Sequence, residues 1–369
     1  MIFLAWVILS SIFFGSYAIY FLYLKTYANR PWNLKIDQEF HPHISILIPA
    51  HNEEENIVTK LEDVSSTRYP REKIEIILVD DASTDGTLNK TYEFIKSHPE
   101  APIKIVKQKV WKGKSSALNE ALKIVVNDIV IVTDADSTWS EDILYKALPY
   151  LADPQIGALT GRVKPRNIDQ NWVTKAEDDY LDLISLVRLG ESKIHSTIRF
   201  EGCFCAYKKK SFVEFDTKSG ADDSGTALNI TQNKFRTILV PEAVTLIDVP
   251  HDLKQRIRTK ARRATHLTEL WIKCLKLLLK GQLSLPKRIA MPELIISIVN
   301  PIIFICLIFV TIIMMMTNPI FLISVIIGLI LVSLSTKARS YAFEGILDHF
   351  ILFYSLILYG SRKKIMAWE

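Results

Sequence analysis

One stretch of the sequence, Ile129-Val-Ile-Val-Thr-Asp-Ala-Asp-Ser137, limits most strongly what this chain can fold into. Its first four residues are apolar and β-branched, which is typical of a strand buried on both faces of a parallel sheet. The strand leads directly into Asp134 and Asp136. Ligands of such sheets bind at the carboxyl ends of the strands. Two carboxylates there suit Mg²⁺ or Mn²⁺ on a phosphate, while a helix cap and a loop residue are the alternative interpretation.

Strands and helices alternate in the segment before this stretch. Short apolar runs at 44–48, 74–79, 103–106 and 129–133 predict four strands, and helical patterns separate them at 52–66, 85–97 and 115–126. Such short connections predict a parallel, doubly wound sheet. The region 144–246 is less regular, with a helix predicted over 171–189.

Apolar residues are concentrated at the two ends of the chain. Residues 2–24 form an almost uncharged run that is long enough to cross a bilayer as a helix. No Lys or Arg precedes this run and bulky aromatic residues fill its end, so we expect a retained anchor rather than a cleaved signal peptide. Lys25, Arg30 and Lys35 follow it, which predicts a cytoplasmic location for the next domain.

The C-terminal third predicts further membrane segments. The apolar runs 294–316 and 319–335 predict a hairpin of two spanning helices. The amphipathic stretch 267–279 predicts a helix in the membrane surface, with a core-facing helix as the alternative. The segment 346–359 carries Asp348 and His349 and has basic residues on both sides. We therefore favour an interfacial or re-entrant segment there over a fourth crossing.

Composition and missing motifs exclude several functions. The net charge of +5 comes without a dense basic stripe, so it suits anionic lipids and phosphorylated substrates rather than nucleic acid. The four cysteines have no metal-ligand spacing, and we expect unpaired thiols. Lys112-Gly-Lys-Ser115 is no phosphate-binding loop, because Gln108 stands where that loop needs glycine. No Gly-x-Gly-x-x-Gly follows a strand, which argues against a dinucleotide-binding domain.

Polar motifs follow successive strands at what should be one edge of the sheet. They are Pro49-x-x-Asn52-Glu53, Asp80-Asp81-x-Ser83-x-Asp85-x-Thr87, Gly113-Lys114-x-x-Ala117-Leu118-Asn119 and Asp134-x-Asp136. Each motif alone is weak, but their order along the chain is specific. Together they resemble the membrane-bound inverting glycosyltransferases of family 2, which have the GT-A fold and include cellulose, hyaluronan and poly-N-acetylglucosamine synthases.

The resemblance covers about residues 44–263 and implies a role for each motif. It predicts an α/β fold with a mixed, mainly parallel sheet flanked by helices, plus transmembrane helices at both ends. The residues expected to bind the nucleotide-sugar are Pro49, Asn52, Glu53, Asp80, Asp81, Gly113, Lys114 and Asp134. Asp134 and Asp136 are expected to bind Mg²⁺ or Mn²⁺ on the diphosphate of the leaving group, which is Lewis-acid chemistry.

The resemblance also implies an acceptor side. Asp222-Asp223 occupies the place of the family's acidic acceptor motif, and Asp223 is the expected general base, with a turn cap as the alternative. Gly202 and Cys203 resemble the glycine-containing loop that lines the acceptor site. Residues implied in acceptor or diphosphate binding are Gly202, Cys203, Asp222, Gln255, Arg258 and Arg262.

One residue departs from the family pattern. Polymer-making members carry Gln-x-x-Arg-Trp, whose Trp stacks on the acceptor sugar, whereas Thr259 follows Arg258 here. This change puts processive polymerisation in doubt and leaves room for a single transfer. Alternatively, the basic segment 254–263 is a surface helix on an anionic membrane.

The expected organisation has six parts. They are a transmembrane helix at 1–24, a linker at 25–42, a cytoplasmic GT-A domain at 43–265, an interfacial helix at 266–290, a transmembrane hairpin at 291–336, and an interfacial or re-entrant segment with a basic tail at 337–369. We expect an inverting transferase of the cell membrane that moves a hexose or N-acetylhexosamine from a nucleotide-sugar, UDP-linked by resemblance, to a glycan or lipid-linked acceptor. A polyprenyl-phosphate glycosyltransferase and an inactive nucleotide-sugar-binding scaffold are the alternatives. Membrane lipids are expected partners, and the sequence is compatible with an oligomer.

Overall fold

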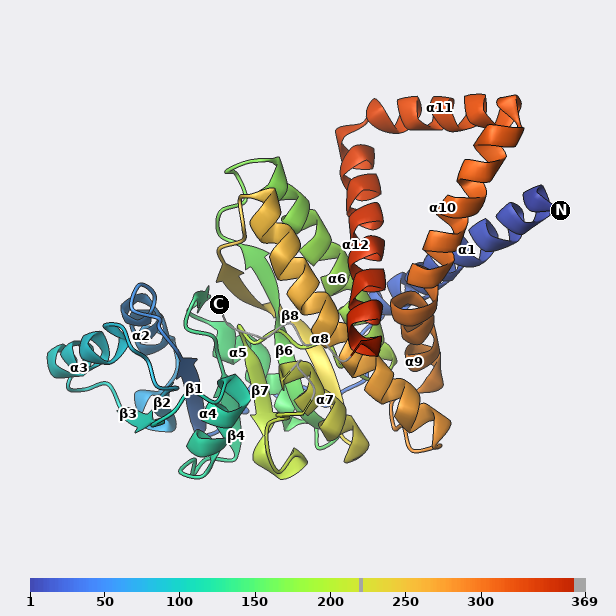
Figure 1. Ribbon diagram of the computed structural model, residues 1–369. Coiled ribbons are helices and arrows are strands. Elements are labelled where there is room, and N and C mark those ends of the chain that lie inside the picture. The colour runs from blue at the N-terminus through green and yellow to red at the C-terminus, as the bar shows by residue number, and fades with distance from the viewer. Residues whose placement is uncertain (219–221, 362–369) are drawn as a thin grey trace. The chain divides into compact units, whose positions relative to one another are not determined.

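The computed structural model describes residues 1–218 and 222–361 (Figure 1). The chain divides into two compact units. The catalytic unit, as we name it, is Leu24–Asp252, and the membrane unit is Met1–Tyr23 with Leu253–Glu369. The basic tail and residues 219–221 of the predicted acceptor turn lie outside the described residues.

The catalytic unit is built on an eight-stranded sheet in the order β3-β2-β1-β4-β7-β6-β8-β5. Strands β3, β2, β1 and β4 are parallel, and so are β6 and β8, while β7 and β5 run antiparallel to their neighbours. The strands are β1 (Ile44–Ala50), β2 (Ile74–Asp80), β3 (Ile103–Lys107), β4 (Ile129–Val132), β5 (Ser137–Trp139), β6 (Ile156–Pro165), β7 (Cys205–Lys208) and β8 (Arg236–Ile247). The predicted mixed, mainly parallel sheet is confirmed.

Helices connect these strands. They are α2 (Ile57–Ser65), α3 (Thr87–Ser97), α4 (Lys114–Leu122), α5 (Ile143–Ala147), α6 (Trp172–Ile194) and α7 (Asp222–Gln232), with 3₁₀ turns at Arg71–Lys73, Leu148–Ala152 and Lys209–Ser211. All four residues of β4 are buried, and Ile44, Ile46, Ile48, Ile129 and Ile131 form the centre of the main core. Because β1 and β4 are buried on both faces, their apolar side chains suit the interior position that the two strands have in the sheet.

One helix begins later than its sequence pattern predicts. The pattern places a helix over 52–66, but α2 begins at Ile57. Asn52 has φ 56°, a left-handed conformation that a helix does not contain. The backbone N–H groups of Asn52, Glu53 and Glu54 donate instead to side chains of the loop after β2 and of the first residue of α3. The acidic residues therefore form part of a structured loop.

The membrane unit consists of helices. They are α1 (Ile2–Ala28, of which residues 2–23 belong to this unit), α8 (Leu253–Leu279), α9 (Lys287–Leu294), a π-helical turn (Ile295–Val299), α10 (Asn300–Thr317), α11 (Pro319–Ser333) and α12 (Thr336–Gly360). Within the described residues, Ile2–Ala28, Lys287–Thr317 and Tyr341–Gly360 are long and apolar enough to cross a membrane. At 15 residues, α11 is shorter than the roughly 20 residues that a crossing needs, and it runs across the ends of α10 and α12 (Figure 1).

Helices α8 and α12 pack side by side in the same direction. Near their N-terminal ends, Arg256 pairs with Glu344, and Lys260 Nζ lies 2.8 Å from Asp348 Oδ1. Farther along, the hydroxyls of Thr268 and Ser355 lie 2.6 Å apart. The predicted amphipathic stretch is thus the second half of one long helix. The side of α12 that faces α8 is polar, whereas His349 contacts the aromatic rings of α1 and α10 on another side.

Candidate active site

The loops after β1 and β2 are bound to each other. Asn52 N donates to Ser83 Oγ at 3.0 Å, and Asn52 Oδ1 accepts from Thr84 N at 2.8 Å. Glu53 N donates to Thr87 Oγ1 at 2.8 Å. Four residues of the two motifs therefore brace one shared rim of the site, and Pro49 lies in β1 just before it. These bonds give Asn52 and Thr87 a structural task in addition to any ligand contact.

The carboxylate of Glu53 lies close enough to Asp134 and Asp136 for their charges to act on it. Its Oε2 accepts from Asn56 Nδ2 at 2.7 Å. Burial raises the pKa of Glu53, and the charges of Asp136 and Asp134 raise it further against the effect of the Asn56 bond. The predicted nucleotide residue Glu53 and the predicted metal pair thus belong to one acidic region.

The two aspartates after β2 shape neighbouring loops. Asp80 is 2% exposed, and its Oδ1 accepts from Ser83 N at 3.3 Å. The Asp81 carboxylate accepts from Lys112 N at 3.0 Å and from Gly113 N at 2.7 Å. Gly113 has φ 89°, a value that L side chains rarely adopt. Asp81 therefore fixes the turn from which α4 and its first residue, Lys114, begin.

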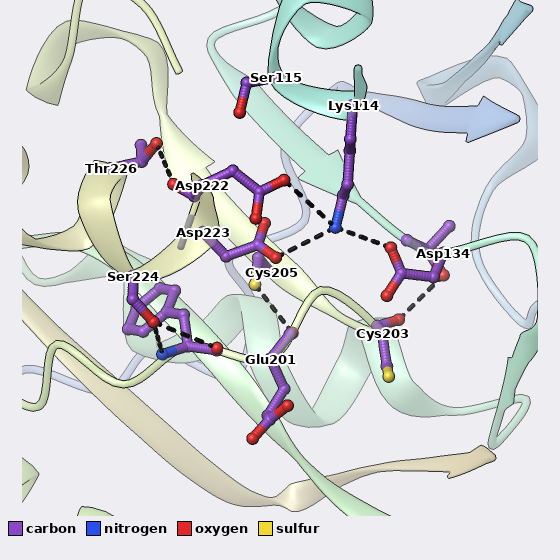
Figure 2. A network of polar contacts seen from close by, with 12 residues as sticks. Lys114, Ser115, Asp134, Glu201, Cys203, Cys205, Asp222, Asp223, Ser224 and Thr226 are labelled. Atoms are coloured by element: carbon purple, nitrogen blue, oxygen red, sulfur yellow. Dashed lines mark hydrogen bonds and ion pairs between the residues drawn. The ribbon is translucent and has the colours of Figure 1, made fainter. Parts of the chain in front are cut away.

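The Lys114 ammonium lies among three carboxylates, one from the turn after β4 and two from the start of α7 (Figure 2). Its Nζ is 2.7 Å from Asp134 Oδ1, 3.0 Å from Asp223 Oδ2 and 3.8 Å from Asp222 Oδ2. Burial alone would lower the pKa of Lys114, but these carboxylates outweigh it and raise that pKa well above its usual value. Tertiary folding thus brings together the metal motif, the lysine motif and the acceptor motif, which are far apart in the sequence.

Helix α4 is attached to the segment that precedes the acceptor motif. Ser115 Oγ donates to Asp216 O at 2.9 Å. Asn119 forms two bonds with Phe215, donating to its carbonyl at 3.0 Å and accepting from its N–H at 2.8 Å. Asn119 and Ser115 of α4 therefore attach Phe215 and Asp216, which precede the Asp222-Asp223 motif, to the helix that begins with Lys114.

The surroundings of Asp223, the predicted general base, are as follows. It is 7% exposed at the start of α7, where Oδ2 accepts from Lys114 and Oδ1 has no hydrogen-bond partner among the described residues. Burial and the adjacent Asp222 raise the pKa of Asp223 to about 7, although Lys114 opposes this shift. A carboxylate with one oriented oxygen, one unoccupied oxygen and a pKa near neutrality can accept a proton from a hydroxyl.

Gly202 lies directly beside this cluster. Asp134 N donates to Gly202 O at 3.2 Å. A Cβ on Gly202 would lie 2.3 Å from Lys114 Nζ and 2.7 Å from both Asp134 Oδ2 and Asp223 Oδ2. A side chain at position 202 would therefore displace the charged groups. The neighbouring Cys203 is buried, and its carbonyl accepts from Thr133 Oγ1 at 2.9 Å.

Asp134 and Asp136 fit a divalent metal that a ligand helps to bind. They supply hard carboxylate oxygens, and Asp136 forms no ion pair within residues 1–218 and 222–361. In that same part of the chain, no group of three or more His, Cys, Asp or Glu residues forms a complete metal site. Mg²⁺ typically takes one or two carboxylates and completes its shell with substrate phosphates and water. Two carboxylates beside the position where the sequence predicts a diphosphate agree with that coordination.

Sequence reasoning missed one aromatic pair at the rim. The rings of His51 and Trp111 stack with centroids 5.7 Å apart and planes at 30°, and Trp111 is 39% exposed. His51 Nδ1 lies 2.8 Å from Asp81 O. The sequence feature that could have indicated this pair is Trp111, an aromatic residue two positions before Gly113. The predicted residues Gln255, Arg258 and Arg262 lie on α8 in the membrane unit, and their role stays a prediction.

Known proteins share both this domain and this architecture. Residues 45–215 match the model of glycosyl transferase family 2. The chain is 28% identical over 263 residues to a poly-β-1,6-N-acetyl-D-glucosamine synthase of Staphylococcus epidermidis, covering 68% of this chain and 62% of that one. It is 27% identical over 223 residues to the synthase of Staphylococcus aureus strain COL, covering 58% of this chain and 53% of that protein. The chain thus spans less than two thirds of the length of these curated relatives.

A solved structure matches almost the full length of the chain. The mannosyltransferase PcManGT from Pyrobaculum calidifontis, solved in complex with GDP-Man and Mn²⁺, superimposes with a TM-score of 0.84 at 27% identity. The match covers 99% of this chain and all of that one. With the mixed sheet and the carboxylates at its edge, these likenesses lead to one conclusion: residues 45–215 form a glycosyltransferase family 2 domain, and its fold is GT-A.

Proposed function

We propose that this protein is a membrane-anchored inverting glycosyltransferase. It transfers a hexose or N-acetylhexosamine from a nucleotide-sugar to a glycan or lipid-linked acceptor. The observation that carries the proposal is the Lys114 cluster, in which the acceptor-side Asp223 and the donor-side Asp134 lie on one ammonium group, at 3.0 and 2.7 Å. Donor and acceptor groups must meet within such a distance for direct transfer.

The chemistry follows from the positions of the carboxylates. The acceptor hydroxyl oxygen forms a bond to the anomeric carbon while the bond from that carbon to the diphosphate oxygen breaks. Asp223 Oδ1, which has no partner among the described residues, takes the hydroxyl proton. Asp134 and Asp136 would hold Mg²⁺ or Mn²⁺, which supplies Lewis-acid neutralisation of the diphosphate. Because the nucleophile attacks opposite the leaving group, the product has inverted configuration.

Two nucleotide classes are candidates for the donor, a UDP-sugar and a GDP-sugar. The synthase relatives make a polymer of N-acetylglucosamine, whereas the mannosyltransferase structure contains GDP-Man. Likeness at the level of 27–28% identity supports a nucleotide-sugar and leaves its base and sugar to experiment. The exposed Trp111 beside His51 gives the nucleotide side of the site an aromatic surface on which a base can stack.

One residue favours a second acceptor class. Thr259 replaces the Trp with which polymer-making members hold a sugar, so a lipid phosphate is the alternative acceptor. Such an acceptor is already ionised and needs no general base. Asp223→Asn therefore separates the two acceptors.

We also propose that the catalytic unit faces the cytoplasm. Lys25, Arg30 and Lys35 follow the first apolar helix, and basic residues next to a membrane helix favour the cytoplasmic side. Protease accessibility in inside-out and right-side-out vesicles tests this orientation. Digestion of the catalytic unit in right-side-out vesicles would contradict it.

The function is tested by donor hydrolysis and transfer. Purified full-length protein is incubated with Mn²⁺ and a panel of UDP-N-acetylglucosamine, UDP-glucose and GDP-mannose, with membrane extract as acceptor and mass analysis of the product. We expect release of a nucleoside diphosphate from one donor, its loss in Asp136→Ala and its retention in Glu72→Ala, a control at another exposed acidic residue. Equally poor hydrolysis by wild type and Asp136→Ala would favour an inactive binding scaffold.

A further inference from the structure

Lys60 is a fully buried lysine beneath the Asp134/Asp136 turn. It lies on the core-facing side of α2 with Ile57, Leu61 and Val64, and its exposed fraction is 0%. Its ammonium has one acceptor for each of its three protons: Thr133 Oγ1 at 2.9 Å, Ser137 Oγ at 3.4 Å and Asp63 Oδ2 at 3.4 Å. The Nζ also lies 4.9 Å from the centre of the Trp139 ring.

Two of these acceptors flank the predicted metal ligands. Thr133 directly precedes Asp134, and Ser137 directly follows Asp136. Ser137 Oγ donates in turn to Asp134 O at 3.0 Å, and Thr133 Oγ1 donates to Cys203 O at 2.9 Å. One ammonium group thus holds both ends of the turn and connects it, through Thr133, to the loop that contains Gly202.

The third acceptor attaches this ammonium to its own helix. Asp63 lies one turn after Lys60 on α2, and its Oδ1 accepts from Trp139 N at 3.3 Å. The strand that leaves the turn, β5, is therefore bound to α2 through Asp63 as well. The entry and exit of the Asp-x-Asp turn are both fixed to one helix.

Burial of the Lys60 ammonium destabilises the fold unless its bonds compensate for the lost hydration. An isolated buried ammonium loses its hydration, and apolar residues of similar volume often replace a buried ion pair without loss of stability. The remainder of the buried face of α2 is apolar. A methionine at position 60 would fill the same space without hydrogen bonds to the turn. The three directed bonds are what lysine adds there.

We propose that Lys60 is a positioning residue that holds Asp134 and Asp136 in the geometry needed to bind a metal–diphosphate complex. The inference rests on the proposed function, because it concerns the same donor site. Lys60 is buried below the turn and contacts no ligand itself. It acts on the carboxylates through Thr133 and Ser137, as outer-sphere partners orient the ligands of metal sites.

The test compares nucleotide binding with and without metal. Calorimetry measures binding of UDP and GDP to purified full-length protein, first with EDTA and then with Mn²⁺. For Lys60→Met we expect unchanged metal-free binding, and a fall of about 10-fold to 100-fold in the affinity gained from Mn²⁺. A residue that only stabilises the core would leave the Mn²⁺ gain intact in all protein that is folded.

A matched control is available in Lys208. It is also buried, at 7% exposure, and its Nζ donates to Asp153 O at 2.7 Å. Lys208 pairs with Ile129, at the other end of β4 from Asp134. Lys208→Met therefore removes a buried ammonium from the same sheet, and we expect the Mn²⁺ gain to remain. An equal loss of the gain in both variants would overturn the proposal.

A second variant guards against misfolding. Lys60→Met leaves Asp63 without its cation, so the double variant Lys60→Met/Asp63→Leu restores charge balance in the core. We expect the double variant to show the same loss of Mn²⁺ gain as Lys60→Met. If either folded variant binds the Mn²⁺–nucleotide complexes like wild type, the inference fails and the proposed function stands. If wild type binds neither nucleotide with Mn²⁺, the proposed function fails first and the inference falls with it.

Discussion

The protein contains two clusters of buried or half-buried charges, and they differ in balance. At the edge of the sheet, Lys114 is the one cation that forms ion pairs with Asp134, Asp222 and Asp223 among the described residues, and Asp136 follows in the turn that contains Asp134. Between α8 and α12, Arg256 and Lys260 face Glu344 and Asp348, so that two cations meet two anions. Counted over the ion pairs of the described residues, the first cluster carries excess negative charge, whereas the second is neutral.

This difference distinguishes the proposed binding site from a structural contact. Excess carboxylates repel one another, and a divalent cation that binds to them reduces this repulsion. The same cation can bind the diphosphate of the donor. A balanced set needs no further ligand. It gives two helices a fixed register, and its four charges are worth most when all are present. Four predictions test this contrast.

The largest effect is expected at Asp223. Asp223→Asn removes the oxygen charge that accepts the proton, so transfer to a hydroxyl acceptor should fall by about 10²-fold to 10⁴-fold. Donor binding, measured by calorimetry, should be retained because the metal carboxylates are untouched. Asp222→Asn is the matched control, with a smaller loss. Full transfer activity in Asp223→Asn would favour an acceptor phosphate that is already ionised.

The next effect tests the balanced cluster. Glu344→Leu leaves Arg256 and Lys260 with Asp348 alone, and the free energy of unfolding should fall by about 3–5 kcal/mol. The double variant Arg256→Met/Glu344→Leu removes one charge of each sign, and most of the stability should return. Denaturant unfolding of the purified full chain measures both. If Glu344→Leu is as stable as wild type, the cluster does not hold the helices together.

The pH dependence of transfer tests the unbalanced cluster. The pKa of Asp223 is raised to about 7, and only the deprotonated carboxylate accepts a proton. Below that pH, kcat/KM should therefore rise about tenfold per pH unit and then level off above it. The Asp222 charge contributes to the raised pKa, so Asp222→Asn should move the profile to lower pH. A flat profile between pH 5 and about 8 would contradict this assignment.

The smallest effect is expected from Lys114→Met. Lys114 competes with a metal for Asp134, so its removal should tighten binding of free Mn²⁺ by roughly tenfold. The same variant should bind the donor diphosphate more weakly, because a nearby positive charge is lost. Titration with Mn²⁺ alone and then with Mn²⁺ and donor measures the two changes. Weaker binding of free Mn²⁺ would show that Lys114 organises the metal carboxylates instead of competing with them.

Much of the fold follows from local patterns. The runs at 44–48 and 74–79 are strands because β-branched apolar residues suit a buried parallel sheet, and β1 and β2 contain both runs. The start of α2 could not be predicted from local pattern. Acidic residues at 53–55 suit a first helical turn, but the backbone N–H groups of Asn52, Glu53 and Glu54 bond to side chains some 30 residues later in the chain.

Lys60 shows the limit of pattern reasoning at the site. Its position among Ile57, Leu61 and Val64 was visible as a lysine on an apolar helix face. That pattern cannot name the partners of the ammonium, because Thr133 and Ser137 are more than seventy residues away. Likewise, the pairing of α8 with α12 joins residues 88 positions apart, such as Lys260 and Asp348.

The sequence by itself determined the strands, the polar motifs at their ends and the apolar helices, because periodicity and residue type act over a few neighbours. Only the tertiary structure decided which charges meet. Asp134, Lys114 and Asp223 converge because the carboxyl ends of parallel strands lie at one edge of the sheet. In addition, α4 is bonded to Phe215, which shortly precedes Asp223 in the sequence. Electrostatic balance is a property of that convergence, since Coulomb energy depends on distance in space rather than on separation along the chain.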